Sequence, residues 1–452
     1  MSLEMKPEQL TLKLPEFDAL SPQAKSSLFQ GESNKLEAED RPFHDWYRFV
    51  LSFPPHLVRH YIKEFGCNEQ QIVLDPFCGT GTTLVEAKRL GLQAIGIEAH
   101  PFTHFASSVK LDWEIDPEAL LSTAHQIAQS VAAQLRSEGI EDTMVLDRLP
   151  DLELRELPTD TDKLLLRGSI SALPLHKTLV LLDELKRYQG QGNRHLQLAL
   201  ANALIMHISN LRFGPEVGVG KKKADAPVLS AWLGEVRKMA KDLSSVAGIE
   251  FPQAHVYRAD AREINKVVPA KTVDVVITSP PYPNEKDYTR TTRLESVLLG
   301  FVSTKAELRE LKQKMVRSNT RGVYKVDDDD QWVTDHAEIQ RIAEQIEKRR
   351  IELGKDSGFE KLYGRVTRLY FGGMARHLAD LRQVLRPGAH LAYVVGDQAS
   401  YLRVMIRTGK LLADIATSLG YKLERIDLFR TRFSTATREQ LREEVVILRW
   451  LS

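Results

Sequence analysis

The chain has 452 residues, of which 27% are charged and 42% hydrophobic, and its 62 Lys and Arg balance 61 Asp and Glu. This balance excludes a uniformly basic nucleic-acid coat, although locally basic faces remain allowed. No signal peptide and no apolar stretch of about 18 residues is found in the sequence. We therefore expect no membrane span. The two cysteines, Cys67 and Cys78, provide neither a disulfide framework nor a zinc cluster, so we expect a cytoplasmic protein without a bound metal.

The first predicted elements follow a polar N-terminal arm at 1–40. Apolar residues from Leu57 to Ile62 indicate a helix, and residues 71–101 then read as a strand, a glycine-rich turn, a helix and a second strand. Such a βαβ unit is typical of a parallel sheet. We assign residues 41–105 to the cofactor-binding half of an α/β domain.

The remaining chain alternates between insertions and further parts of the sheet. Amphipathic segments at 117–138, 193–212 and 228–244 predict a helical insertion over 106–250. Strand patterns return within 251–295, a second insertion covers 296–362, and a helix, a strand and two final strands occupy 363–452. The prediction is therefore an α/β fold: a doubly wound Rossmann-like sheet with an antiparallel C-terminal strand and two largely helical insertions.

The glycine-rich turn "LDPFCGTGTT" (74–83) does not complete the dinucleotide fingerprint, because Leu84 stands where a third glycine is required. Asp75 at the strand end would repel a pyrophosphate but suits an ammonium group, which favours S-adenosylmethionine over a nicotinamide cofactor. Glu98 ends the next strand and could accept hydrogen bonds from ribose hydroxyls, while Asp260 could receive an adenine amino group. The alternatives are a helix N-cap for Asp75 and a solvated strand end for Glu98.

A second strand end, "VDVVITSPPY" (273–282), carries Ser279, Pro280, Pro281 and Tyr282. The Ser279 hydroxyl and the Pro280 carbonyl are two acceptors that could hold the hydrogens of a nucleobase amino group and aim its lone pair. Pro281 stiffens the turn, and the Tyr282 ring offers a face on which a base can stack. The alternative is an edge turn with a half-buried ring.

Together, "DPFCGTGTT" and "TSPPY" resemble the S-adenosylmethionine-dependent amino-methyltransferases that modify exocyclic amino groups in DNA. The serine form resembles the cytosine-N4 branch, since adenine-N6 enzymes more often carry Asp or Asn at position 279. "SFPPHLV" (52–58) resembles the family motif at the methionine end of the cofactor, with Ser52 where lysine is usual. The resemblance implies a doubly wound methyltransferase sheet and these cofactor-binding residues: Phe53, Pro54, Asp75, Pro76, Phe77, Cys78, Gly79, Gly81, Thr82, Thr83, Glu98, Asp260 and Ala261.

An enzyme of this kind must rotate its target base out of the duplex and hold the DNA phosphates with basic groups. Two stretches, one in each insertion, could do so, although each also reads as a solvated surface run. A third stretch, "DYTRTTR" (287–293), lies nearer the catalytic strand and could approach the flipped nucleotide or its phosphates. The candidate DNA-binding residues are Lys221, Lys222, Lys223, Tyr288, Arg290, Arg293, Arg317 and Arg321.

The sequence thus predicts a nucleoid-associated DNA methyltransferase that makes N4-methylcytosine in double-stranded DNA, with a cognate restriction endonuclease as an open partner. Two enzyme alternatives stay open, namely adenine-N6 methylation of DNA and guanine-N2 methylation of RNA. A non-enzymatic DNA-binding module is disfavoured because Ser279 and Tyr282 are both present.

Overall fold

The computed structural model describes residues 37–48, 52–142, 153–214, 216–284, 286–434 and 438–452. The predicted N-terminal arm at 1–40 therefore lies almost wholly outside the described residues. Within the described ranges, every helix is too short or too polar to cross a bilayer.

Seven strands of the described chain form one sheet in the order β5-β2-β1-β6-β7-β9-β8. The strands from β5 to β7 in this order are parallel, and β9 runs antiparallel to both of its neighbours. This confirms the predicted doubly wound sheet with an antiparallel C-terminal strand. Their bounds are β1 Ile72–Asp75, β2 Gln93–Ile97, β5 Ala254–Tyr257, β6 Val273–Thr278, β7 Leu385–Gly396, β8 Lys422–Ser434 and β9 Glu439–Arg449.

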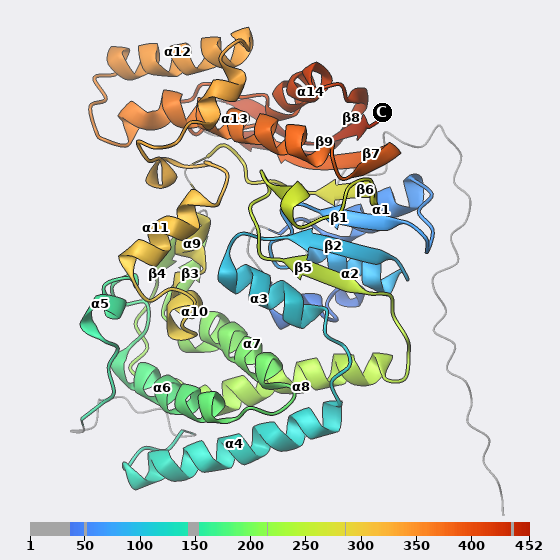
Figure 1. Cartoon of the computed structure of the whole chain (residues 1–452). Helices are drawn as coiled ribbons and strands as arrows, with labels where there is room; N and C mark the ends of the chain where they lie inside the picture. The colour runs from blue at the N-terminus through green and yellow to red at the C-terminus, as the bar shows by residue number, and fades with distance from the viewer. Residues whose placement is uncertain (1–36, 49–51, 143–152, 215, 285, 435–437) are drawn as a thin grey trace, which may run out of the picture.

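Helices cover both faces of this sheet (Figure 1). Successive strand residues point to opposite faces, so Val73 and Val275 pack into one core while Leu74 and Val276 pack into the other. The first core includes side chains of α1 (Pro55–Glu64), α2 (Thr82–Arg89) and α3 (Pro101–Lys110). The second includes α13 (Tyr363–Leu381) and α14 (Thr408–Ser418). Burial on both faces explains why the strands read as continuous apolar runs.

The glycine-rich turn lacks a third glycine, and Gly96 on β2 provides the space that this glycine would give. A Cβ on Gly96 would lie 2.5 Å from Leu84 Cδ1 and 2.9 Å from Cys78 Sγ. Close packing of α2 on the sheet is therefore achieved by a glycine on the strand, which leaves room for a large side chain on the helix.

The first insertion is mostly helical, and it also contains a β-hairpin that the sequence pattern did not predict. The hairpin pairs β3 (Leu211–Phe213) with β4 (Val217–Val219) in antiparallel register. The predicted boundary at 105 falls inside α3. The helices of this insertion are α4 Pro117–Ser137, α5 Thr159–Asp162, α6 Ala172–Arg187, α7 Asn193–Ala203 and α8 Val228–Val246.

The second insertion packs beside the carboxyl end of β6 and over α13 (Figure 1). Its predicted start at 296 falls inside α10, whereas its predicted end at 362 coincides with the start of α13. The helices between β6 and α13 are α9 Tyr288–Thr291, which precedes the predicted insertion, and α10 Arg293–Leu298, α11 Lys305–Gln313 and α12 Ala337–Glu352.

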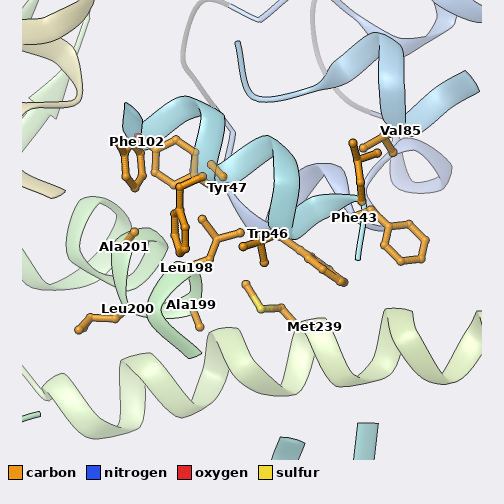
Figure 2. Close-up of a cluster of buried hydrophobic side chains, with 14 of the residues drawn as sticks. Phe43, Trp46, Tyr47, Val85, Phe102, Leu198, Ala199, Leu200, Ala201 and Met239 are labelled. Carbon is orange, nitrogen blue, oxygen red and sulfur yellow. The ribbon is translucent and has the colours of Figure 1, made fainter. Parts of the chain in front are cut away.

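An aromatic segment near the start of the described chain joins the first insertion to the sheet domain. Figure 2 shows Phe43, Trp46 and Tyr47 gathered with side chains of α2, α3, α7 and α8. The indole of Trp46 and the backbone N–H of Phe43 both donate to Asp242 of α8, at 2.8 Å and 3.0 Å. The insertion is therefore held in a fixed position relative to the sheet.

Candidate active site

The carboxyl ends of β1 and β6 meet where the strand order reverses, which is the place where sheets of this kind bind ligands. Val73 pairs with Val275 and Leu74 with Val276, so the two strands end in register. The Thr278 hydroxyl donates to Asp75 Oδ1 at 2.6 Å, and the Thr83 hydroxyl donates to the Ile277 carbonyl at 3.0 Å. The glycine-rich turn and the Ser279–Tyr282 turn consequently lie side by side.

One cavity of about 510 Å³ is lined by both turns. Its walls include most of the predicted cofactor residues and the whole predicted catalytic turn. Asp75, Gly81 and Thr83 do not line it. The predicted residues that do are Phe53, Pro54, Pro76, Phe77, Cys78, Gly79, Thr82, Glu98, Asp260, Ala261, Ser279, Pro280, Pro281, Tyr282 and Tyr288.

Asp75 has a different position from the one expected for an ammonium-binding carboxylate. It is fully buried, and its Oδ1 accepts hydrogen bonds from Thr278 and from the backbone N–H of Phe77. Burial raises its pKa to about 6, against the lowering effect of these hydrogen bonds. Asp75 therefore joins β1, β6 and the glycine-rich turn, and it acts on the cavity by positioning its walls.

The glycine-rich turn leaves its backbone accessible from the cavity. Gly79 has φ +52° and lines the cavity, and a Cβ placed on it would meet nothing within 4 Å. Gly81 adopts φ +84° as the N-cap residue of α2, where an added Cβ would lie 3.1 Å from Ser107 Cβ. A positive φ and a close approach both favour glycine.

Glu98 places a carboxylate in the same cavity. Burial raises its pKa to about 7, although the backbone N–H of His100 donates to it at 2.7 Å and that of Gly79 also contributes. A half-buried carboxylate, the Phe53 and Phe77 rings and an open glycine backbone match the ribose, base and methionine parts of S-adenosylmethionine. The residues present therefore fit this cofactor.

Asp260 is less available than the sequence suggested. It lies three residues beyond the end of β5, and Arg262 binds it through Nη2 to Oδ2 at 2.6 Å and through Nε to Oδ1 at 3.0 Å. Arg262 also forms an ion pair with Asp329 of the second insertion. Asp260 still lines the cavity, so a contact with an adenine amino group would have to use the oxygen lone pairs that Arg262 leaves.

The Ser279–Tyr282 turn is held by contacts from three directions. Ser279 lies close enough to the Tyr282 hydroxyl to lower its pKa, and the backbone of Tyr282 acts in the same way on the pKa of the Tyr288 phenol. The Tyr282 ring packs against Gly396 at the end of β7, where an added Cβ would lie 2.9 Å from Tyr282 Cε2. Burial raises the Tyr282 pKa, so the phenol stays protonated at neutral pH.

Comparisons with known proteins find similarity to methyltransferases. The N6_N4_Mtase family model, described as DNA methylase, matches residues 23–106. The type II methyltransferase M.BsoBI of Geobacillus stearothermophilus is 26% identical over 91% of this chain and 85% of its own. M.AvaI of Nostoc sp. is 23% identical over 91% of this chain and 87% of its own.

The family model and these two relatives support an S-adenosylmethionine-dependent amino-methyltransferase. S-adenosylmethionine is accordingly its methyl donor. Among solved structures, the rRNA methyltransferase aviRa from Streptomyces viridochromogenes covers 92% of this chain and 93% of its own. Its identity of 11% and TM-score of 0.32 make this likeness too distant to bear on function.

The cavity is also lined by residues that sequence reasoning missed. Arg430, Arg432 and Glu443 come from the β8–β9 hairpin, and Glu216 from the β3–β4 hairpin. No local motif marks them. The available signal was the charged residues of the two C-terminal strands, which by themselves indicate only a solvated edge.

The predicted DNA-binding lysines lie on an exposed loop that follows β4. Lys221 and Lys222 are exposed, whereas the Lys223 ammonium donates to the His207 carbonyl at 2.6 Å and its pKa is lowered by partial burial. Arg290 of α9 lies 3.6 Å from Glu216 of the β3–β4 hairpin, so this hairpin contacts α9 beside the cavity that Glu216 lines.

Two predicted DNA-binding arginines are structural. Arg317 is buried and pairs with Asp327 at 2.7 Å. This ion pair holds the loop after α11 together. The half-buried Arg293 donates to the carbonyls of Thr289 and Leu164, at 2.9 Å and 3.2 Å. Neither guanidinium is presented to a phosphate. The Arg321 guanidinium lies 5.7 Å from the ring of the exposed Phe359, and the Arg321 side chain is half-buried.

Proposed function

We propose that this amino-methyltransferase acts on double-stranded DNA and methylates the exocyclic N4 amino group of an extruded cytosine. The observation that carries the proposal is the hydrogen bond between Thr278 and Asp75, which fixes the Ser279–Tyr282 turn beside the glycine-rich turn in one cavity. A donor methyl group and a target amine need such a shared cavity, because aligned reacting groups lower the barrier by several kcal/mol.

The residues of the chain would act by orientation and charge placement. S-adenosylmethionine, when bound, supplies a methyl group on a sulfonium. Glu98 would accept hydrogen bonds from its ribose hydroxyls, and the open backbone at Gly79 would face it. The Pro280 carbonyl and the Ser279 hydroxyl would accept the two hydrogens of the target amine, which directs the nitrogen lone pair away from the ring. Tyr282 would support the face of the base.

Cytosine is favoured over adenine by the serine at position 279, as in the cytosine-N4 branch that the turn resembles. The type II relatives support a DNA substrate and a restriction endonuclease as the companion of this enzyme. The first insertion is proposed as the DNA-contacting part, supported by the exposed Lys221 and Lys222 and by Glu216 at the cavity.

The test is to incubate the protein with isotope-labelled S-adenosylmethionine and mixed-sequence DNA or total RNA, followed by mass analysis of the nucleosides. Labelled N4-methylcytosine in DNA is the expected product. Labelled N6-methyladenine would replace the cytosine assignment, and label in RNA guanine alone would refute the DNA substrate. Tyr282→Ala protein is the control for label that does not depend on the catalytic turn.

A further inference from the structure

A cross-strand row of residues continues the cavity wall away from the catalytic turn. Gly396 of β7 pairs with Glu443 of β9, and Glu443 pairs with Arg430 of β8. Directly paired residues in antiparallel strands present their side chains on the same face. Because Gly396 faces the Tyr282 ring, Glu443 and Arg430 extend from that ring along the same wall of the cavity.

A β-bulge in β8 shapes this wall. Leu428 and Arg430 oppose the consecutive residues Glu444 and Glu443, so Phe429 is the extra residue of the bulge. Neighbouring residues of a regular strand point to opposite faces, yet Phe429 and Arg430 both line the cavity. Bulges re-aim side chains in this way next to active sites. Arg430 is thus directed into the site by an irregularity of the strand.

Arg430 is held in a defined orientation and keeps donors available. Its Nε donates to Glu443 Oε2 at 2.5 Å, and its side chain is 29% exposed. Among the described residues, its two terminal nitrogens have no hydrogen-bonding partner. Glu443 also compensates the guanidinium charge, so the pair does not repel a sulfonium in the same cavity.

We propose that Arg430 reads the target base by donating hydrogen bonds to the N3 and O2 atoms of the extruded cytosine. This inference rests on the proposed function. In cytosine, N3 and O2 follow the reacting amino group along the ring edge, and both are acceptors. In adenine the corresponding positions are N1, an acceptor, and C2–H, which leaves one guanidinium donor without a partner. A planar fork of two N–H donors distinguishes these two edges.

The test uses duplexes that carry cytosine or 3-deazacytosine, which lacks the N3 acceptor, at the methylation site found on mixed-sequence DNA. The proteins are the wild type, Arg430→Met and, as a matched control on the same strand, Arg425→Met, because Arg425 is also a carboxylate-paired arginine at 35% exposure. We expect Arg430→Met to lower kcat/KM on cytosine by about 10- to 100-fold, the usual scale for a bidentate base contact.

The decisive quantity is the ratio of kcat/KM on cytosine to kcat/KM on 3-deazacytosine. The difference in intrinsic reactivity between cytosine and 3-deazacytosine is the same for all proteins, so it cancels when their ratios are compared. The ratio should fall about tenfold in Arg430→Met and stay unchanged in Arg425→Met. An equal ratio in the wild type and Arg430→Met would overturn the inference, as would an equal loss of S-adenosylmethionine affinity. Arg430→Lys, which keeps the charge, should give an intermediate ratio.

These outcomes separate the inference from the function on which it rests. The identity of the methylated nucleoside made by the wild type reports on the proposed function. The change of the ratio between the wild type and Arg430→Met reports on Arg430.

Discussion

Gly396→Ala is a substitution outside the catalytic turn that should impair catalysis through Tyr282. The new Cβ would lie 2.9 Å from Tyr282 Cε2, whereas ordinary carbon contacts begin at 3.4 Å. The ring must therefore move by about 0.5 to 1 Å to restore normal contact distances. A misplacement of about 1 Å costs roughly 100-fold in rate, so we expect kcat to fall about 10- to 100-fold. Because the clash involves one ring beside a cavity, the loss of stability should be about 1 kcal/mol.

The assay for Gly396→Ala combines single-turnover methyl transfer with S-adenosylmethionine binding by calorimetry. Binding should be unchanged, and Gly234→Ala is the control because a Cβ there would meet nothing within 4 Å. If Gly396 acts through the ring, adding Gly396→Ala to Tyr282→Ala should cause no further loss. Additive losses, or a matching loss of cofactor affinity, would refute this reasoning.

Three further predictions concern other parts of the site. Tyr282→Ala should cut turnover strongly with cofactor affinity nearly intact, and equal losses of both would make the ring structural. The double substitution Lys221→Ala and Lys222→Ala should weaken DNA binding. It should also reduce the slope of log K against log salt concentration by about 0.9 for each phosphate that these lysines neutralise. The control Lys348→Ala on α12 should change neither quantity. Glu98 has a raised pKa of about 7 in the folded state, so the folded chain binds more protons than the unfolded one, and stability falls as pH rises from about 4.5 to 7. Glu98→Gln removes this pH-dependent loss. In urea unfolding, the free energy of unfolding of the variant should therefore rise by about 2–3 kcal/mol relative to that of the wild type between pH 4.5 and 8. A difference between the two proteins that does not change with pH would contradict this prediction.

Local pattern was sufficient for much of the fold. The glycine-rich turn, the apolar strands and the helices at 117–138 and 228–244 are encoded within short windows, because each depends on side-chain periodicity or on turn residues. The antiparallel C-terminal strand also followed from its own pattern. The β3–β4 hairpin was missed because strands of three residues are too short to show an alternation.

For the candidate site, the sequence predicted the position of some residues at the cavity, and the structure changed the position expected for others. Residues directly after β1, β2 and β6 were placed at the cavity by a rule about parallel strand ends, and the sequence by itself determined them. Asp75 turned inward because Thr278 on the neighbouring strand supplies a buried donor. Arg317 turned inward for a similar reason, because it forms a buried ion pair with Asp327. Separating this pair would leave a buried charge without compensation, which is costly.

The cavity wall formed by β7, β8 and β9 was decided by tertiary structure alone. Arg430 and Glu443 reach the cavity through the pairing of β8 with β9 and of β9 with β7, and through a bulge at Phe429. Strand register and bulges arise from contacts between distant segments, so no window of the sequence contains them. The sequence by itself determined which strand ends meet at the cavity, and the pairing of strands in the sheet decided which further side chains line it.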